Sequence, residues 1–159
     1  MMQRTVSYSR TILSQTMPIS MANSAGNIHG GEIMKIMDSA AGVAAKRHAR
    51  SPVVTARVNE LEFMTPVHVG DLLICTAELI FVGRTSMEVL VTVEVENLQV
   101  EAPPTVALTG YFTMVAIGPD GRPKPVPGLI PETPAEKRRY EERKKIYLER
   151  KQAASSARQ

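Results

Sequence analysis

The segment from Glu32 to about His48 constrains the fold most strongly, because it carries the only long internal helical pattern of the chain. Its apolar side chains recur at spacings that cover almost the whole circumference of a helix. They are Ile33, Met34, Ile36, Met37, Ala40, Ala41, Val43, Ala44 and Ala45. A helix that is apolar on nearly all sides is typical of the interior of a domain. We therefore expect a buried central helix surrounded by the rest of the chain.

Four β-type segments follow this helix, with no helical pattern between them. They are residues 52–63, 71–84, 85–97 and 105–117. The third has the cleanest alternation, with Met87, Val89, Val91, Val93 and Val95 on one face. Strands without intervening helices are expected to pair antiparallel as a meander. With one strand or two short strands in residues 4–20, the pattern predicts an α+β fold in which a curved antiparallel sheet of about five strands wraps the helix.

The chain is expected to contain one main domain, residues 1–131, and a basic C-terminal helix with a frayed tail, residues 132–159. Thr133 is a good N-cap, proline follows it, and Glu136 completes a capping box. We expect this helix to end near Lys151 and residues 153–159 to fray.

The proline-rich stretch 119–134 is predicted to be a surface linker. Between Glu132 and Lys151 there are eight Lys or Arg residues and five Glu, so the C-terminal helix carries the net charge of +3. The main domain is nearly neutral, and the chain has no Trp, three Phe and four Tyr for stacking on bases. Nucleic acid is therefore disfavoured as a partner, except through the basic helix.

A single cysteine, Cys75, excludes an intrachain disulfide and a Cys-based metal site. The three histidines are scattered along the sequence, so a zinc site is improbable and we expect no bound metal. We expect His48 and His68 to lie at the surface. No apolar run is long enough to span a bilayer, so no membrane association is expected. The first 31 residues lack acidic residues and could mark a transit peptide, but their alternation favours a strand and a cytoplasmic protein.

Asp38 is the anomalous residue of the central helix. Its neighbours at spacings of three and four are Met34, Ala41, Gly42 and Ala45. Burial of an unpaired carboxylate costs several kcal/mol, so Asp38 needs a partner or a wet cavity. One interpretation is a structural carboxylate bound to backbone or to an arginine. The other is a general base or nucleophile in a partly apolar cleft.

Gly30 and Gly31 lie at the expected start of the same helix. Backbone N–H groups at a helix N-terminus can stabilise a developing oxyanion, although two glycines can also simply form a tight turn. Asp38 follows about two turns later, on the same side of the helix. An electrophilic helix end with a carboxylate beyond it suits the hydrolysis of an ester or thioester.

The run Asn23-Ser-Ala-Gly-Asn-Ile-His29-Gly30-Gly31, with Met37-Asp38 and Ala41-Gly42 after it, resembles the hotdog-fold acyl-CoA thioesterases. It is most similar to the cytosolic acyl-CoA hydrolase branch. The resemblance continues through residues 53–55, 66–71 and 83–86 and covers roughly residues 8–118.

The resemblance implies hydrolysis of acyl-CoA to free fatty acid and CoA, with no separate cofactor. Asp38 would activate water or attack the thioester, and Asn23 of a partner subunit would position that water. The Gly31 N–H, alone or with His29, would polarise the carbonyl, although His29 could equally cap a turn.

The resemblance also implies that CoA contacts Gly30, Thr55 and the segment Gly83-Arg84-Thr85-Ser86. Arg84 would bind phosphate, whereas the alternative is an ordinary hairpin turn. The family forms dimers with one continuous sheet, and trimers of dimers are common in this branch, which makes a hexamer plausible. A non-catalytic acyl-CoA-binding or regulatory module is the alternative function.

Overall fold

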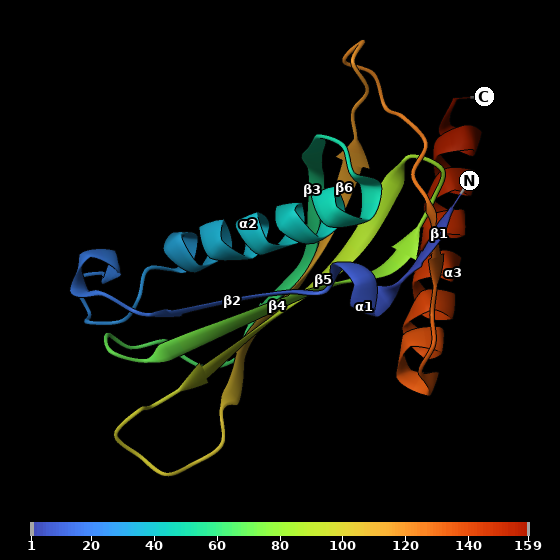
Figure 1. The fold of residues 1–159 in the computed structure, drawn as a ribbon. Coiled ribbons are helices and arrows are strands. Elements are labelled where there is room, and N and C mark those ends of the chain that lie inside the picture. The colour runs from blue at the N-terminus through green and yellow to red at the C-terminus, as the bar shows by residue number, and fades with distance from the viewer. Residues whose placement is uncertain (1, 159) are drawn as a thin grey trace.

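The computed structural model describes residues 2–158 and consists of one long helix lying across a five-stranded antiparallel sheet (Figure 1). The helix is α2, Gly30–Ala49. The strands follow the order β2 (Thr11–Thr16), β4 (Leu72–Val82), β5 (Ser86–Glu96), β6 (Thr105–Ala116) and β3 (Val53–Phe63). This arrangement confirms the predicted α+β fold.

Strand β3 lies in a different place from the one the sequence predicts. Strands β4, β5 and β6 form the expected meander, but β3 pairs with β6 at the far edge and not with β4. Most β3 side chains are exposed, whereas β4 ends in the buried run from Leu79 to Val82. The more apolar strand therefore takes the interior position, and β3 becomes an edge.

The prediction that α2 is buried on all sides is wrong. Seven residues are buried along the face toward the sheet: Ile33, Met37, Ala40, Ala41, Ala44, Ala45 and His48. Lys35, Asp38, Ser39 and Val43 are exposed. Alanines on the buried face let the helix approach the sheet closely, and one face is enough to complete a core of this size.

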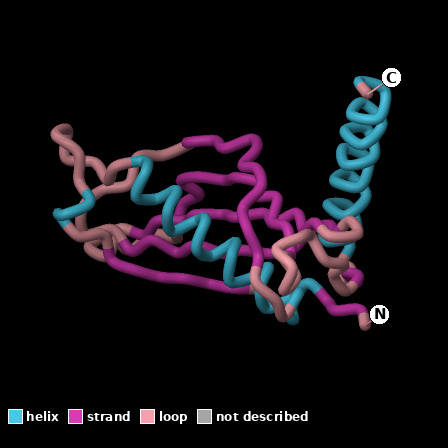
Figure 2. Tube along the Cα trace, turned by 90° about the horizontal axis from the view of Figure 1, so that it is seen from above, coloured by secondary structure: helices cyan, strands magenta, loops and turns pink. Residues whose placement is uncertain are grey.

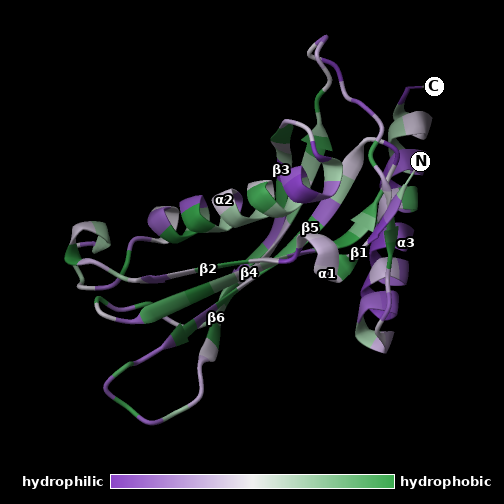
Figure 3. Cartoon of the chain, in the orientation of Figure 1, coloured by the Kyte–Doolittle hydropathy of each residue, from purple (hydrophilic) through white to green (hydrophobic). Residues whose placement is uncertain are grey.

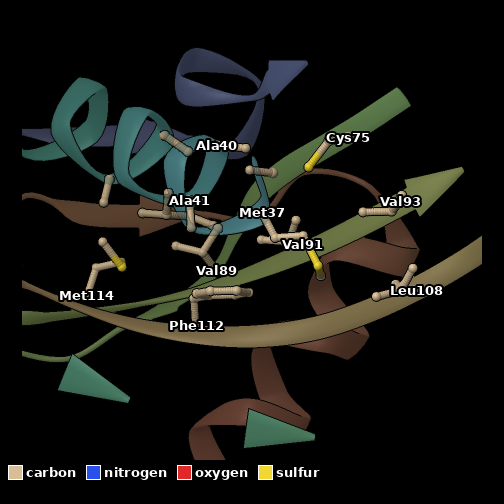
Figure 4. Packing of buried hydrophobic residues seen from close by; sticks show 14 of the residues in the cluster. Met37, Ala40, Ala41, Cys75, Val89, Val91, Val93, Leu108, Phe112 and Met114 are labelled. Carbon is tan, nitrogen blue, oxygen red and sulfur yellow. The ribbon is translucent and has the colours of Figure 1, made fainter. Parts of the chain in front are cut away.

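The core lies between α2 and the inner face of the sheet (Figure 4). Met87, Val89, Val91 and Val93 alternate inward along β5 as predicted and pack with Leu108, Phe112 and Met114 of β6. Cys75 is buried on β4, and burial raises the pKa of its thiol to about 12. The cysteine is thus a core residue.

His48 was expected at the surface and is instead fully buried at the end of α2. Its Nε2 atom lies 2.8 Å from the carbonyl oxygen of Pro127. Burial lowers the pKa of the imidazole. The contact ties the end of α2 to the segment that follows the sheet.

The N-terminal residues form two strands separated by one helical turn: β1 (Gln3–Thr5), α1 (Val6–Ser9) and then β2. Strand β1 pairs in parallel with β7 (Gly128–Ile130), so the predicted linker contains a strand. A short 3₁₀ turn, Ile19–Met21, follows β2.

Helix α3, Pro134–Ala157, starts at the predicted capping box of Thr133 and Glu136. It continues six residues beyond the predicted end, so the frayed tail is helical. The part of α3 up to Tyr147 packs on β4, where the rings of Tyr140 and Tyr147 lie 5.1 and 5.2 Å from that of Phe81. Beyond this part, α3 extends past the sheet (Figure 2), and the helix as a whole is largely hydrophilic (Figure 3).

Candidate active site

The carboxylate of Asp38 is paired with the hydroxyl of Thr55 across the gap between α2 and β3. The Thr55 hydroxyl donates to Oδ1 of Asp38 at 2.6 Å. Both residues are exposed, and within residues 2–158 Asp38 forms no ion pair with an arginine, lysine or histidine. The carboxylate therefore borders solvent with one oxygen free, which is the arrangement a general base or nucleophile needs.

Thr55 was expected to contact substrate, and its bond to Asp38 was not foreseen. The hydroxyl is also 3.5 Å from the sulfur of Met114, and β3 is irregular between Thr55 and Arg57. The spacing of residues 38 and 55 in the sequence does not predict the bond between Thr55 and Asp38. That bond depends on the position of β3 at the edge of the sheet, beside α2.

The start of α2 is capped by the side chain of His29. Its Nδ1 atom accepts a hydrogen bond from the Gly31 N–H at 3.1 Å. The expectation that His29 could cap a turn is thus met, and the Gly31 N–H already has an acceptor. In a neutral imidazole whose Nδ1 accepts, the proton is on Nε2. The Nε2–H of the exposed His29 ring is therefore a second hydrogen-bond donor at the start of α2.

Gly30 lies against the ring of Phe63 at the end of β3. A Cβ atom at Gly30 would be 3.2 Å from that ring, closer than ordinary contact. A larger residue would require the exposed ring of Phe63 to shift by a few tenths of an ångström.

Asn23 does not meet Asp38 within the described chain. Its Oδ1 accepts from the N–H groups of Ala25 and Asn27, at 3.0 and 3.2 Å. These bonds fix an exposed loop before α2 and leave the amide NH₂ free to donate outward.

Gly83, Arg84, Thr85 and Ser86 form the turn between β4 and β5. The Gly83 N–H donates to the Ser86 carbonyl at 2.9 Å, and the Arg84 side chain is exposed. A Cβ atom at Gly83 would lie 2.9 Å from the Tyr147 hydroxyl, so α3 packs directly on this turn. The turn and Thr55 lie at the same end of the sheet, about two strand spacings, or ~10 Å, apart.

A cavity of about 440 Å³ lies on the opposite side of α2, against β2. Its lining includes Leu13, Met21, Ile36, Ser39 and Leu73, and none of the predicted site residues. In one chain, Asp38 and Thr55 thus lie at an exposed surface beside β3.

Residues 2–158 contain no group of three or more His, Cys, Asp or Glu residues that could hold a metal ion. Among the same residues, we find no helix with the length and hydropathy that crossing a membrane requires. Of the histidines, His68 has a largely exposed side chain, as predicted.

A central helix packed on an antiparallel sheet, with a carboxylate on the helix and glycines at its start, defines a hotdog domain. The family model of the thioesterase superfamily matches residues 25–102. The mouse cytosolic acyl coenzyme A thioester hydrolase is 38% identical over 151 residues, which cover 92% of this chain and 39% of that protein. The chain thus spans about two fifths of the length of its mammalian relatives.

Two solved structures extend the comparison over nearly the full chain. An apo-hexameric acyl-CoA thioesterase is 37% identical, with a TM-score of 0.90 over 97% of this chain and 98% of its own. A Staphylococcus aureus acyl-CoA hydrolase, solved with butyryl coenzyme A, coenzyme A and coenzyme A disulfide, is 30% identical, with a TM-score of 0.82 over 99% of both chains. The chain belongs to the thioesterase superfamily.

Proposed function

We propose that this protein hydrolyses acyl-CoA thioesters to free fatty acid and CoA, with Asp38 as the general base or nucleophile. The observation that carries the proposal is the exposed Asp38 carboxylate, held by the Thr55 hydroxyl at 2.6 Å and following the glycine start of α2 by about two turns. Three relatives that cover more than nine tenths of the chain are named as acyl-CoA hydrolases or thioesterases.

The chemistry follows from one free carboxylate oxygen. Thr55 holds Oδ1, so Oδ2 can take a proton from water as the water oxygen attacks the thioester carbonyl. Collapse of the tetrahedral intermediate breaks the C–S bond, and the CoA sulfur leaves with that proton as the free thiol. If Oδ2 attacks directly, the C–S bond breaks as a mixed anhydride forms, and CoA leaves as a thiolate that takes a proton from water. A second water then hydrolyses the anhydride, which releases the fatty acid and restores the Asp38 carboxylate.

The helix start supplies the positive potential for the developing oxyanion. In the free protein, the Gly31 N–H donates to Nδ1 of His29. The thioester carbonyl oxygen therefore has two possible donors: the Gly31 N–H, once the His29 ring has turned away, or the Nε2–H of His29 itself. In both cases Gly31 and His29 act together at one helix end.

The spacing of Asn23, Asp38 and Thr55 supports their joint role. The S. aureus hydrolase was also solved as separate alanine variants of an asparagine, an aspartate and a threonine. In that protein the asparagine precedes the aspartate by 15 positions and the threonine follows it by 17, which are the spacings found here. We infer that these three residues serve one site.

Two protomers complete that site in our proposal. Strand β3 is an open edge with exposed Val54, Val58 and Phe63, so a second copy can extend the sheet there. Such pairing would bring Asn23 of the partner to Asp38, which Asn23 of the same chain does not contact. Since a similar structure is hexameric by name, we propose that dimers assemble further into trimers of dimers.

For the CoA part we propose contacts with Gly30, Thr55 and the turn Gly83-Arg84-Thr85-Ser86. The exposed guanidinium of Arg84 suits a phosphate group, and no cofactor beyond the substrate is needed. The mammalian relatives are named cytosolic, and we infer a cytoplasmic location for this chain.

The direct test is release of free thiol from acyl-CoAs of short to long chain length by the purified protein. We expect release with at least one chain length and its loss in Asp38→Asn, with CoA binding retained. Saturable CoA binding without thiol release at any chain length would contradict hydrolysis and favour a non-catalytic acyl-CoA-binding module.

A further inference from the structure

A group of cations surrounds Tyr8 where α1 meets the C-terminal end of α2. This group, the Tyr8 cluster, consists of Tyr8, the three arginines Arg4, Arg47 and Arg50 around it, and Lys46, which is exposed one helical turn before Arg50. The Arg4 guanidinium lies 4.5 Å from the centre of the Tyr8 ring, and that of Arg50 lies 5.5 Å from it. Arg47 donates to the Tyr8 carbonyl at 3.3 Å and to the Arg10 carbonyl at 2.8 Å.

The cluster lacks a counter-charge within residues 2–158. None of its three arginines forms an ion pair with a carboxylate, and neither does Lys46. The nearby Glu78 and Glu136 pair with Arg10 instead. Like charges three and four positions apart on a helix repel, and the C-terminus of α2 offsets only about half a charge. An anion would relieve this repulsion.

Arg50 presents its guanidinium in the geometry that suits such an anion. Its Nε and Nη2 atoms both donate to the single hydroxyl oxygen of Tyr8, at 3.1 and 3.0 Å. Two parallel N–H groups fit two oxygens of a carboxylate or phosphate better than one phenol oxygen. In addition, Nε of Arg4 is buried without a hydrogen-bond partner. The donors of the cluster thus exceed its acceptors.

The cluster is separate from the reacting carboxylate but near the turn proposed for CoA. Arg50 follows Asp38 by twelve positions, which is about 18 Å along α2. Arg4 of the cluster pairs with Leu129 of β7. Three residues before Leu129, the Val126 N–H donates to the carbonyl of Arg84 in the turn. Along residues 126–129, the two contacts are therefore about 10 Å apart. CoA carries a diphosphate and, separately, a phosphomonoester on its ribose.

We propose that the Tyr8 cluster is a phosphate-binding site for a phosphomonoester, supplied either by the ribose 3′-phosphate of CoA or by free phosphate. The first source rests on the proposed acyl-CoA hydrolysis, whereas the second is independent of it. In either case Lys46 and Arg50 supply the exposed charges that the anion meets, and Arg4 closes the site from β1.

The test is calorimetric binding of CoA, dephospho-CoA and inorganic phosphate to the full chain, which needs no turnover. The variants are Arg50→Asn, because asparagine tolerates the left-handed backbone at this position, and Lys46→Gln, which removes only an exposed charge. Lys137→Gln, an exposed cation of α3 outside the cluster, is the matched control.

If the 3′-phosphate is the ligand, wild type and Lys137→Gln bind CoA about tenfold more tightly than dephospho-CoA, and both cluster variants lose that preference. If free phosphate is the ligand, wild type binds phosphate, the cluster variants do not, and CoA and dephospho-CoA bind alike. Equal affinities of the cluster variants and wild type for all three ligands would overturn the proposal, whether or not thiol release is found.

Discussion

The two edges of the sheet differ in how this chain protects them. At the β2 edge, Arg47 donates to the Arg10 carbonyl at 2.8 Å and to the Thr11 hydroxyl at 3.2 Å, and a cavity of about 440 Å³ separates β2 from α2. At the β3 edge, most side chains are exposed and the strand has two irregularities, with Glu60 at a φ of 51°.

The difference between the two edges bears on where the proposed reaction would take place. Asp38 and Thr55 face the open β3 edge, whereas the adjacent Ser39 lines the cavity beside β2. An open strand edge invites pairing with a second chain. The carboxylate that we propose as the reacting group therefore lies where a partner can complete its surroundings, and the cavity beside β2 lies on the other side of α2.

Replacement of Asp38 should have the largest effect. Asp38→Asn removes the proton acceptor or nucleophile, and we expect kcat to fall by about two orders of magnitude or more. Ser39→Ala, one position along on the other side of α2, should retain near-wild-type turnover. Thiol-release kinetics measure both, and equal losses would show that the two sides of α2 do not differ as described.

Disruption of the open edge should weaken the assembly. Val58→Lys places a charge at a β3 side chain that is 40% exposed in one chain, and we expect self-association to weaken by about tenfold or more. Ile12→Lys makes the matched change on β2, where the side chain is 58% exposed, and should leave association unchanged. Sedimentation over a dilution series distinguishes them; an effect of Ile12→Lys alone would reverse the assignment of the edges.

Loss of the Thr55 hydroxyl should lower kcat by less than the replacement of Asp38 does. Thr55→Val keeps the shape but removes the 2.6 Å bond to Asp38, and we expect kcat to fall by about tenfold. Thr55→Ser restores a hydroxyl and should recover most of the activity. If the valine and serine variants turned over equally, the hydroxyl would have no part in holding the carboxylate.

The smallest effect concerns stability, away from both edges. Burial lowers the pKa of His48 below its ordinary value of 6.5, so below that pH the unfolded chain binds a proton that the folded chain does not. The free energy of unfolding should therefore fall as the pH drops from about 6.5 toward the lowered pKa. In His48→Gln this loss should be smaller than in the wild type, measured by urea denaturation at pH 7.5 and 5. An equal loss of unfolding free energy between pH 7.5 and 5 in the wild type and in His48→Gln would show that His48 does not titrate as stated.

The sequence was a good guide where a pattern is local. The period of β5 predicts its buried face, the helix pattern predicts α2, and the capping box predicts the start of α3. The edge position of β3, the pairing of β1 with β7 and the burial of His48 depend on contacts between distant segments, and no local pattern encodes them.

The candidate site divides in the same way. Asp38 stands out in the sequence as a charge among apolar neighbours, and Gly30 and Gly31 stand out at the expected start of the helix. The resemblance added Thr55 and Asn23. The bond between Thr55 and Asp38 and the capping of Gly31 by His29 needed coordinates, because both depend on backbone geometry.

Mixing two inactive variants tests most directly whether two chains share one site. Asn23→Ala and Asp38→Asn should each abolish most thiol release as pure proteins. After subunit exchange in an equal mixture, half of the dimers carry one site with both native residues, so we expect about a quarter of the wild-type activity to return. A mixture that exchanges subunits and stays inactive would contradict a site shared between Asp38 of one chain and Asn23 of the next.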